Sequence, residues 1–202
     1  MFTGLIQEKG KIIRLHHSSK GIQLTCQVSA TLLAQIKIGD SIAVDGACLT
    51  CISKKGRQFT VDIMPETFKR TCLSQKHVGD TVNIEPAMSA SSRFEGHIVT
   101  GHIDIQTRLL AKKNLENALI LTFLYPKGHE GEIIPQGSVA INGVSLTVVS
   151  CDEKGFTVSL IPHSRQGTNL GHLRLGDTVN IETDILGKYI KAQLNGERRA
   201  YV

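Results

Sequence analysis

An internal repeat with a constant offset of 97 residues constrains this chain more than any other feature. The segment GDTVNIE occupies residues 79–85 and returns unchanged at 176–182. In the same register, Gly46 of VDGACLT corresponds to Gly143 of INGVSLT (143 − 46 = 97). This period is too long for a solenoid, whose repeats run to about 20–50 residues. The chain is therefore expected to contain two related domains, each with its own core.

The pattern within each copy is that of β-strands. The first copy has six short runs, rich in β-branched residues and often alternating: KIIRL, IQLTCQV, SIAVDG, CLTCISK, QFTVDIM and TVNIEP. Evenly spaced short strands favour a small closed barrel or a sandwich over an open sheet. Residues 29–36 and 67–75 are predicted as short helices, each opened by a Ser or Thr cap.

The predicted organisation is all-β, with domains at residues 1–97 and 98–184 and a C-terminal α-helix within 185–202. Asp184 is the expected N-cap of this helix. Four apolar residues follow it at helical spacing: Leu186, Tyr189, Ile190 and Leu194. A lone amphipathic helix of about 10–12 residues is marginal in water. Its apolar face therefore covers a barrel or meets the same helix of other subunits, and we favour the second.

Composition excludes several classes of protein. Hydrophobic content of 41% and charged content of 20% are ordinary for a globular chain. No apolar run approaches the roughly 18 residues that a membrane-spanning helix needs. The start, MFTGLIQEKG, lacks the features of a signal peptide, so we expect a cytoplasmic protein. A net charge of +5 with 4% aromatic residues does not favour nucleic-acid binding.

The C-x-x-C spacing of Cys48 and Cys51 first suggests a redox dithiol or half of a zinc site. On a strand, however, residues three apart point to opposite faces. At the repeat offset Cys48 becomes Ser145, while Cys51 becomes Val148, as a core position would. We therefore take Cys48 and Ser145 as the functional pair and Cys51 as packing.

The two histidines of HIVTGH and the general frequency of Ser, Thr and Cys in strands bear on how this pair is interpreted. His97 and His102 of HIVTGH are also opposite in phase on a strand, which disfavours a metal site. Two nucleophile-capable residues in two related domains suggest two similar small-molecule pockets. Ser, Thr and Cys are also common in strands for purely structural reasons. The residues alone leave both interpretations open.

Seven segments in order resemble the α-type riboflavin synthase family over essentially the full chain: MFTGLI, VDGACLT, MPET, GHIVTGHID, INGVSLT, LIPH and ETDILGKY. The resemblance implies two tandem six-stranded Greek-key β-barrels, each with a lumazine site, and a homotrimer gathered by the C-terminal helix. It implies dismutation of two 6,7-dimethyl-8-ribityllumazine molecules to riboflavin and 5-amino-6-ribitylamino-2,4-pyrimidinedione, without a metal or organic cofactor. Lumazine synthase is a further partner that it suggests.

The resemblance also implies the substrate contacts, at a site between the N-terminal barrel of one subunit and the C-terminal barrel of its neighbour. The first pocket would comprise Gly4, Leu5, Ile6, Ser41, Cys48, Leu49, Thr50, Asp62, Ile63, Met64, Pro65, Glu66 and Thr67. The second would comprise Gly101, His102, Ile103, Gln136, Ser145, Leu146, Thr147, Ser159, Leu160, Ile161, Pro162, His163 and Ser164. Hydroxyl groups would hold the ribityl chain.

Six residues are expected to serve the chemistry: Phe2, Cys48, His102, Ser145, Thr147 and Asp184. His102 would transfer the proton, because the ordinary pKa of histidine lies near neutrality; a structural hydrogen-bonding role is its alternative. Cys48 and Ser145 would act as nucleophiles or orient water. Thr147 and Asp184 would assist, and Phe2 would form a wall.

Two competing functions remain at this level. A non-catalytic lumazine- or flavin-binding protein of the same fold would share most of these motifs, although retention of Gly-x-[Cys/Ser]-Leu-Thr in both copies favours the enzyme. A thiol redox protein would need both cysteines on one turn. The chain also departs from many relatives at Asn142, Gln136 and Glu95, so we expect no acid-base role for Asn142.

Overall fold

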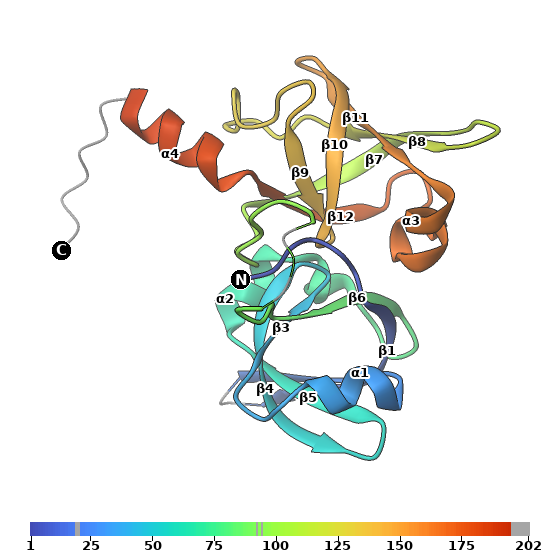
Figure 1. Cartoon of the computed structure of the whole chain (residues 1–202), viewed down its shortest axis with the longest axis vertical. Helices are drawn as coiled ribbons and strands as arrows, with labels where there is room; N and C mark the ends of the chain where they lie inside the picture. Colours follow the sequence, from blue (N-terminus) through green and yellow to red (C-terminus); the bar gives the residue numbers. More distant parts are fainter. Residues whose placement is uncertain (19–20, 92, 94, 195–202) are drawn as a thin grey trace.

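The computed structural model describes residues 1–18, 21–91, 93 and 95–194, and Figure 1 shows them as two barrels, one above the other. The first barrel contains β1 (Glu8–Ser18), β2 (Gly21–Gln27), β3 (Ser41–Val44), β4 (Ala47–Lys55), β5 (Gln58–Ile63) and β6 (Thr81–Pro86). The second contains β7 (Ile105–Asn114), β8 (Leu119–Leu124), β9 (Ser138–Ile141), β10 (Val144–Cys151), β11 (Gly155–Leu160) and β12 (Thr178–Thr183).

Both barrels are closed and share one strand order. In the first barrel the order is β1-β2-β5-β4-β3-β6, with β6 pairing back onto β1, and all pairs are antiparallel. The second repeats this order from β7 to β12. Strands β3, β4 and β5 are consecutive neighbours, and β6 returns to lie beside β3, which is the order of a Greek key. The predicted pair of six-stranded Greek-key barrels is confirmed, whereas the domain boundaries at residues 97 and 184 stay predictions.

Each barrel has its own hydrophobic core, built by strand alternation. Along β4, for example, Leu49 and Cys51 are buried, while Cys48 is half-buried and Thr50 is exposed. The Cys51 thiol lies in the first core, on the face opposite to Cys48, as the strand pattern predicted. The aromatic rings of Phe123 and Phe156 stack in the second core, with centroids 5.6 Å apart.

Short helices close the ends of the barrels. Helix α1 (Ala30–Gln35) begins after Ser29, whose hydroxyl accepts a hydrogen bond from Leu32 N, so this predicted helix and its cap are confirmed. The helix predicted for 67–75 is wrong in its start and its continuity. Helix α2 (Pro65–Arg70) begins earlier because proline is favoured at the first helical position, and it ends at Thr71, which is extended. The short 3₁₀ helix η1 (Cys72–Gln75) follows.

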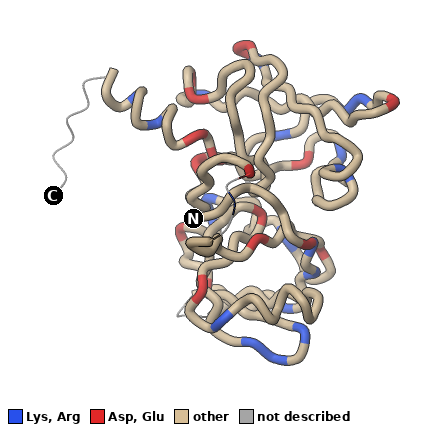
Figure 2. The backbone as a smooth tube through the Cα atoms, viewed as in Figure 1, with Lys and Arg blue, Asp and Glu red and all other residues tan. Residues whose placement is uncertain are grey.

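The second barrel repeats this connection. Helix α3 (Pro162–Gly167) and the 3₁₀ helix η2 (Asn169–His172) stand at the repeat offset from α2 and η1. Lys and Arg residues are distributed over both barrels among Asp and Glu residues (Figure 2). Within the described part of the chain, no helix has the length and apolar character needed to cross a membrane.

Helix α4 (Ile185–Leu194) projects away from the second barrel (Figure 1). The Asp184 side chain accepts a hydrogen bond from Leu186 N, which confirms it as the N-cap. The four residues of the apolar stripe are 62%, 66%, 60% and 81% exposed: Leu186, Tyr189, Ile190 and Leu194. The stripe therefore covers neither barrel of its own chain. The rest of the predicted segment, residues 195–202, lies outside the described residues.

Candidate active site

Two tight turns meet where the barrels touch. Asp45 and Gly46 join β3 to β4, and Asn142 and Gly143 join β9 to β10; all four have positive φ values. A Cβ atom on Gly46 would lie 2.7 Å from Gly143 N, so only glycine allows this approach of the two backbones. Because the next strands begin directly after these turns, the contact brings the starts of β4 and β10 to the inter-barrel boundary.

The segments preceding the barrels cross this boundary in opposite directions. Phe2 and Val99 form an antiparallel bridge. Beyond it, Gly101 O accepts a hydrogen bond of 2.9 Å from Cys48 N in the first barrel. Reciprocally, Gly4 O accepts one of 2.8 Å from Ser145 N in the second barrel. Each repeat therefore supplies a segment to the other repeat's barrel.

This exchange overturns the expected grouping of the two pockets within the chain. Residues 4–6 were assigned to the Cys48 pocket, but Gly4 abuts Ser145 and Ile6 packs against the second core. Residues 101–103 lie instead beside Cys48, with Ile103 against the first core. The offset identifies equivalent residues, but it does not reveal that an extended segment packs against the neighbouring barrel.

A cavity of about 190 Å³ lies at the Cys48 end of the first barrel. Residues of three segments line it: Ala47, Cys48, Glu66, Thr67, Arg70, Thr71, Gly101, His102 and Ile103. His102 and Cys48, assigned to different pockets from the sequence, therefore share one. Arg70 was not predicted as a site residue, although its place at the end of α2 beside the MPET motif is a usable signal.

The predicted contact residues divide by burial. Those in the interior are Phe2, Gly4, Leu49, Ile63, Gly101, Leu146 and Leu160. Half-buried ones are Ile6, Ser41, Cys48, Thr67, Ile103, Ser145, Ser159, Ser164 and Asp184. Exposed ones are Leu5, Thr50, Asp62, Met64, Pro65, Glu66, His102, Gln136, Thr147, Ile161, Pro162 and His163. The side chains of Leu49, Ile63, Leu146 and Leu160 belong to the barrel cores, so these positions offer a ligand only backbone atoms.

Polar side chains on the outer face of the first barrel form a cross-strand row. Ser41 on β3 pairs with Thr50 on β4, and Thr50 pairs in turn with Asp62 on β5. Directly opposed residues in a sheet have Cβ atoms about 4.5–5.5 Å apart. In the second barrel Ser138 pairs with Thr147 in the same way. Such a row matches a chain of hydroxyl groups laid across the strands.

The Ser145 side chain has a partner that the sequence did not identify. His97 Nδ1 lies 2.7 Å from Ser145 Oγ, and His97 N donates to Thr3 O. Burial lowers the pKa of His97, and the nearby Asp184 carboxylate opposes this shift. Burial therefore favours the neutral form of the imidazole. From the sequence, His97 is a candidate only for a metal site, because strand phase says nothing about contacts with another barrel.

Phe2 is fully buried between the barrels, packed with Ala43, Val99 and Ala140 and against the half-buried Cys48. It therefore supports Cys48 from behind and presents no exposed surface to a ligand. Gln136 lies in the loop before β9, where it has a positive φ and its N–H donates to Val148 O.

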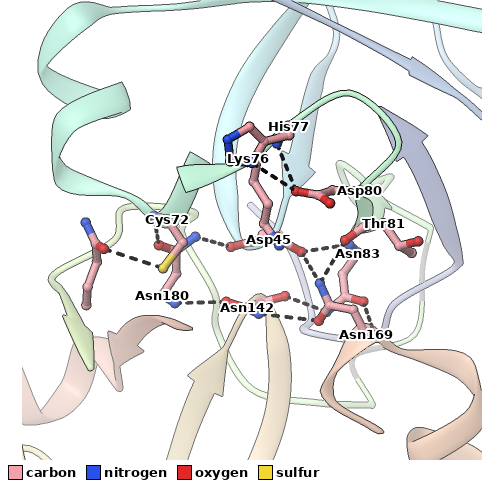
Figure 3. A network of polar contacts seen from close by, with 11 residues as sticks. Asp45, Cys72, Lys76, His77, Asp80, Thr81, Asn83, Asn142, Asn169 and Asn180 are labelled. Atoms are coloured by element: carbon pink, nitrogen blue, oxygen red, sulfur yellow. Dashed lines mark hydrogen bonds and ion pairs between the residues drawn. The ribbon is translucent and has the colours of Figure 1, made fainter. Parts of the chain in front are cut away.

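A buried polar network fixes the two barrels against each other (Figure 3). The Asp45 carboxylate, 0% exposed, accepts hydrogen bonds of 2.8 Å from Asn83 N and Asn169 Nδ2. Lys76 Nζ lies 3.2 Å from its other oxygen. Burial raises the pKa of Asp45, and the Lys76 ammonium is the strongest influence in the opposite direction.

Asn142 belongs to the same network. Its side-chain oxygen accepts from Asn180 N, and its carbonyl accepts from Asn83 Nδ2. At the repeat offset Asn142 and Leu173 correspond to Asp45 and Lys76, so one side of the pseudo-symmetric interface is charged and the other neutral. The amide side chain therefore has a structural role here.

Comparisons with known proteins cover nearly the whole chain. Residues 3–87 and 100–184 each match the lumazine binding domain family. The riboflavin synthase of Actinobacillus pleuropneumoniae is 44% identical over 192 residues, which cover 95% of this chain and 88% of that protein. The riboflavin synthase of Bacillus subtilis (strain 168) is 40% identical over 190 residues, with coverages of 94% and 88%.

Solved structures support the architecture. LumP complexed with riboflavin superposes with a TM-score of 0.84 at 24% identity, covering 91% of this chain and 99% of that one. LumP complexed with 6,7-dimethyl-8-(1′-D-ribityl) lumazine gives a TM-score of 0.82 at the same identity and coverage. At this level of identity the likeness concerns the fold alone.

Proposed function

The chain belongs to the riboflavin synthase family, and on this premise we propose how its two barrels divide one reaction between them. The protein is a transferase that dismutates two molecules of 6,7-dimethyl-8-ribityllumazine, yielding riboflavin and 5-amino-6-ribitylamino-2,4-pyrimidinedione. One molecule gives up a four-carbon unit and the other receives it. Two homologous barrels suit such a reaction, because they bind the same compound in different roles. The observation that carries this proposal is that Gly-x-[Cys/Ser]-Leu-Thr is retained in both copies, beginning at the turns at Gly46 and Gly143, where the barrels meet.

Each lumazine would bind at the open end of one barrel. In the first, the ring would lie near Cys48 and residues 101–103, between backbone groups of β4 and the start of α2. The row of Ser41, Thr50 and Asp62 would hold the ribityl hydroxyls. In the second, the ring would lie near Ser145 and residues 4–6, with the ribityl chain along Thr147 and Ser159. Exposed apolar Met64 and Ile161, equivalent by the repeat, would cover the two rings.

The chemistry requires removal of a proton from the C7 methyl group of one lumazine and addition of a nucleophile at C7 of the other. Ser145 with His97 is suited to the first task, since the imidazole lies within hydrogen-bond distance of the hydroxyl and its neutral form, which burial favours, can accept a proton. Cys48, with His102 at the same cavity, is suited to the second, either directly or by orienting water. Asp184 and Thr147 would assist Ser145. Holding two reactants together supplies much of the acceleration.

On this proposal, the two lumazines that react with each other are not bound to the same chain. The reacting pair would form between the first barrel of one subunit and the second barrel of another, within a homotrimer. The exposed apolar stripe of α4 supports this assembly, because such a stripe is stabilised by packing against other apolar surfaces. Association with lumazine synthase remains a prediction. Five unpaired cysteines agree with a cytoplasmic location.

The test is to incubate the purified protein with 6,7-dimethyl-8-ribityllumazine alone, in buffer with a metal chelator, and to follow both compounds by absorbance. We expect one riboflavin for two lumazines consumed. Tight lumazine binding with a fluorescence change but no riboflavin would instead identify a non-catalytic binding protein of the same fold.

A further inference from the structure

The segment that carries His102 is attached to the second barrel at both of its ends. At its start, Thr100 N and Gly101 N donate hydrogen bonds of 2.6 Å and 2.9 Å to the Glu182 carboxylate. At its end, Asp104 N donates to Ile181 O, and Asp104 Oδ2 accepts a bond of 2.8 Å from Thr183 N. Only the middle of the segment reaches the Cys48 cavity. The end of β12 therefore sets where His102 stands over the first barrel.

The Asp104 attachment continues into α4. Lys188 Nζ lies 2.6 Å from Asp104 Oδ2, and the two side chains are only 24% and 18% exposed. Thr183 Oγ1 lies 3.2 Å from the same carboxylate oxygen. An ion pair with this much burial and with additional hydrogen bonds is less screened by water than a surface pair. The first turn of α4 is thus connected through Asp104 to the segment that bears His102.

A second ion pair lies beside it and reaches Asp104 only indirectly, through Glu132 and Thr183. Lys191, one helical turn after Lys188, places its Nζ 2.8 Å from Glu132 Oε1 and 2.7 Å from Gly128 O. Its partners belong to the loop between β8 and β9, where Glu132 Oε2 accepts a hydrogen bond of 2.9 Å from Thr183 Oγ1. The two lysines therefore hold the same helix, but only Lys188 contacts Asp104 directly, which makes them a matched pair for experiment.

The internal repeat shows that the Asp104 attachment is not a requirement of the barrel fold. The carboxylate clamp occurs in both copies, because Glu85 binds Thr3 and Gly4 as Glu182 binds Thr100 and Gly101. Of the second attachment, only the backbone bond recurs, since Gln7 N donates to Ile84 O; the side-chain contacts of Asp104 do not. At the repeat offset, Gln7, Pro86 and Ser91 replace Asp104, Thr183 and Lys188. Proline has no N–H to donate, and no lysine faces the equivalent segment from position 91. The additional contacts occur only in the copy that is followed by α4.

We propose that Asp104, Thr183 and Lys188 are positioning residues that link α4 to the His102 segment, so that packing of α4 in the oligomer determines the position of His102 over the Cys48 cavity. This inference rests on the proposed function. It assigns α4 a second role in addition to holding subunits together. A small displacement of His102 relative to Cys48 lowers turnover while the rest of both pockets stays intact, because the addition step depends steeply on the geometry of the groups that carry it.

Lys188→Met tests the link, with Lys191→Met as the matched control and Lys188→Arg as the conservative rescue. Each variant is measured as the full-length protein for kcat and KM with lumazine, for molar mass by light scattering, and for hydrogen exchange of the amides at 100–104. We expect Lys188→Met to lower kcat by about tenfold or more at unchanged KM and mass. Its 100–104 amides are expected to exchange faster, because they lose an attachment. Lys188→Arg restores both values, and Lys191→Met, whose connection to Asp104 is indirect, changes the exchange at 100–104 much less than Lys188→Met does.

Three results overturn the link. The first is that Lys188→Met has the same amide exchange at 100–104 and the same kcat as the wild-type protein. Another is equal loss of activity in both Met variants together with a fall in molar mass, which would mean that the lysines serve assembly alone. A third is faster exchange at 100–104 without any change in kcat. Absence of riboflavin formation by the wild-type protein would instead reject the proposed function. In that case, lumazine affinity at the Cys48 cavity replaces kcat as the readout, and unchanged affinity in Lys188→Met overturns the link.

Discussion

Ser145 N donates a hydrogen bond of 2.8 Å to Gly4 O, although the two residues belong to different copies of the repeat. Cys48 N and Gly101 O form the equivalent bond in the opposite direction. These two bonds make the pockets composite, since each combines a β-strand of one copy with an extended segment of the other. A single substitution in either segment is therefore expected to act on the pocket of the other repeat.

Gly101→Ala tests this crossing. Gly101 has φ +83°, and an added Cβ would lie 2.5 Å from Cys48 Cβ, so the segment must move away from the first barrel. We expect equilibrium dialysis to show loss of one of two bound lumazines. Gly39→Ala is the control, since it has φ +94° with nothing within 4 Å of the added atom. It should cost only the strain of about 1–3 kcal/mol and leave both sites occupied. Two lumazines bound to Gly101→Ala would contradict the composite pocket.

Ser145→Ala and His97→Gln test the hydrogen-bonded pair. Both are expected to lower kcat by about 100-fold, the lower range for loss of a general base, while lumazine binding in the other pocket persists. The double variant should be no slower than either single variant, because the two residues act as a unit. Ser150→Ala, an exposed position on the same strand, serves as the control. Full activity of His97→Gln would remove His97 from the mechanism.

The lowered pKa of His97 predicts a pH dependence of stability. Its ordinary pKa is 6.5, and burial depresses the pKa in the folded state, so the unfolded chain binds more protons between the two values. The free energy of unfolding is therefore expected to fall as pH drops below 6.5, by at most about 1.4 kcal/mol per pH unit. Urea unfolding from pH 8 to pH 5 measures this, with His97→Gln as the reference that lacks the slope. If the unfolding free energies of the wild-type protein and His97→Gln change in parallel with pH, His97 is not the source of the pH dependence.

A double-mutant cycle examines the buried pair between the barrels. Lys76→Leu leaves the Asp45 carboxylate unpaired at 0% exposure, which should cost about 3–5 kcal/mol of unfolding free energy. Adding Asp45→Asn reproduces the Asn142 and Leu173 arrangement of the other copy and is expected to recover roughly 2 kcal/mol. Urea unfolding of the four proteins gives the coupling. If the losses of unfolding free energy in the two single variants add up in the double variant, Asp45 and Lys76 have no stabilising interaction with each other.

The apolar stripe of α4 predicts the oligomeric state. A combined Leu186→Glu and Ile190→Glu variant places two charges on a surface that is 62% and 60% exposed in one chain. If this surface is covered in a trimer, sedimentation should show monomers, and riboflavin formation should fall at least tenfold because the paired pockets separate. Leu175→Glu, at a site 66% exposed away from α4, is the control. A wild-type sedimentation coefficient for the α4 variant would place the subunit interface elsewhere.

Much of this molecule could be predicted from its own repeat. The offset of 97 pairs strand with strand and Cys48 with Ser145. Alternation along β4 predicted that Cys48 and Cys51 would point to opposite faces, and the counterpart Val148 predicted that Cys51 would be the buried one; the structure confirms both. These inferences succeed because they depend on local geometry: side chains alternate along a strand, and duplicated sequences fold alike.

The sequence by itself determined the two barrels, the N-cap at Asp184 and the equivalence of Cys48 and Ser145. Only the tertiary structure decided that residues 4–6 lie beside Ser145, that residues 101–103 lie beside Cys48, and that His97 contacts Ser145. The physical reason is that a repeat makes two copies equivalent without stating which copy each contact joins. Exchange of segments satisfies the same backbone hydrogen bonds as packing within one copy, so the choice depends on how the barrels meet at Gly46 and Gly143.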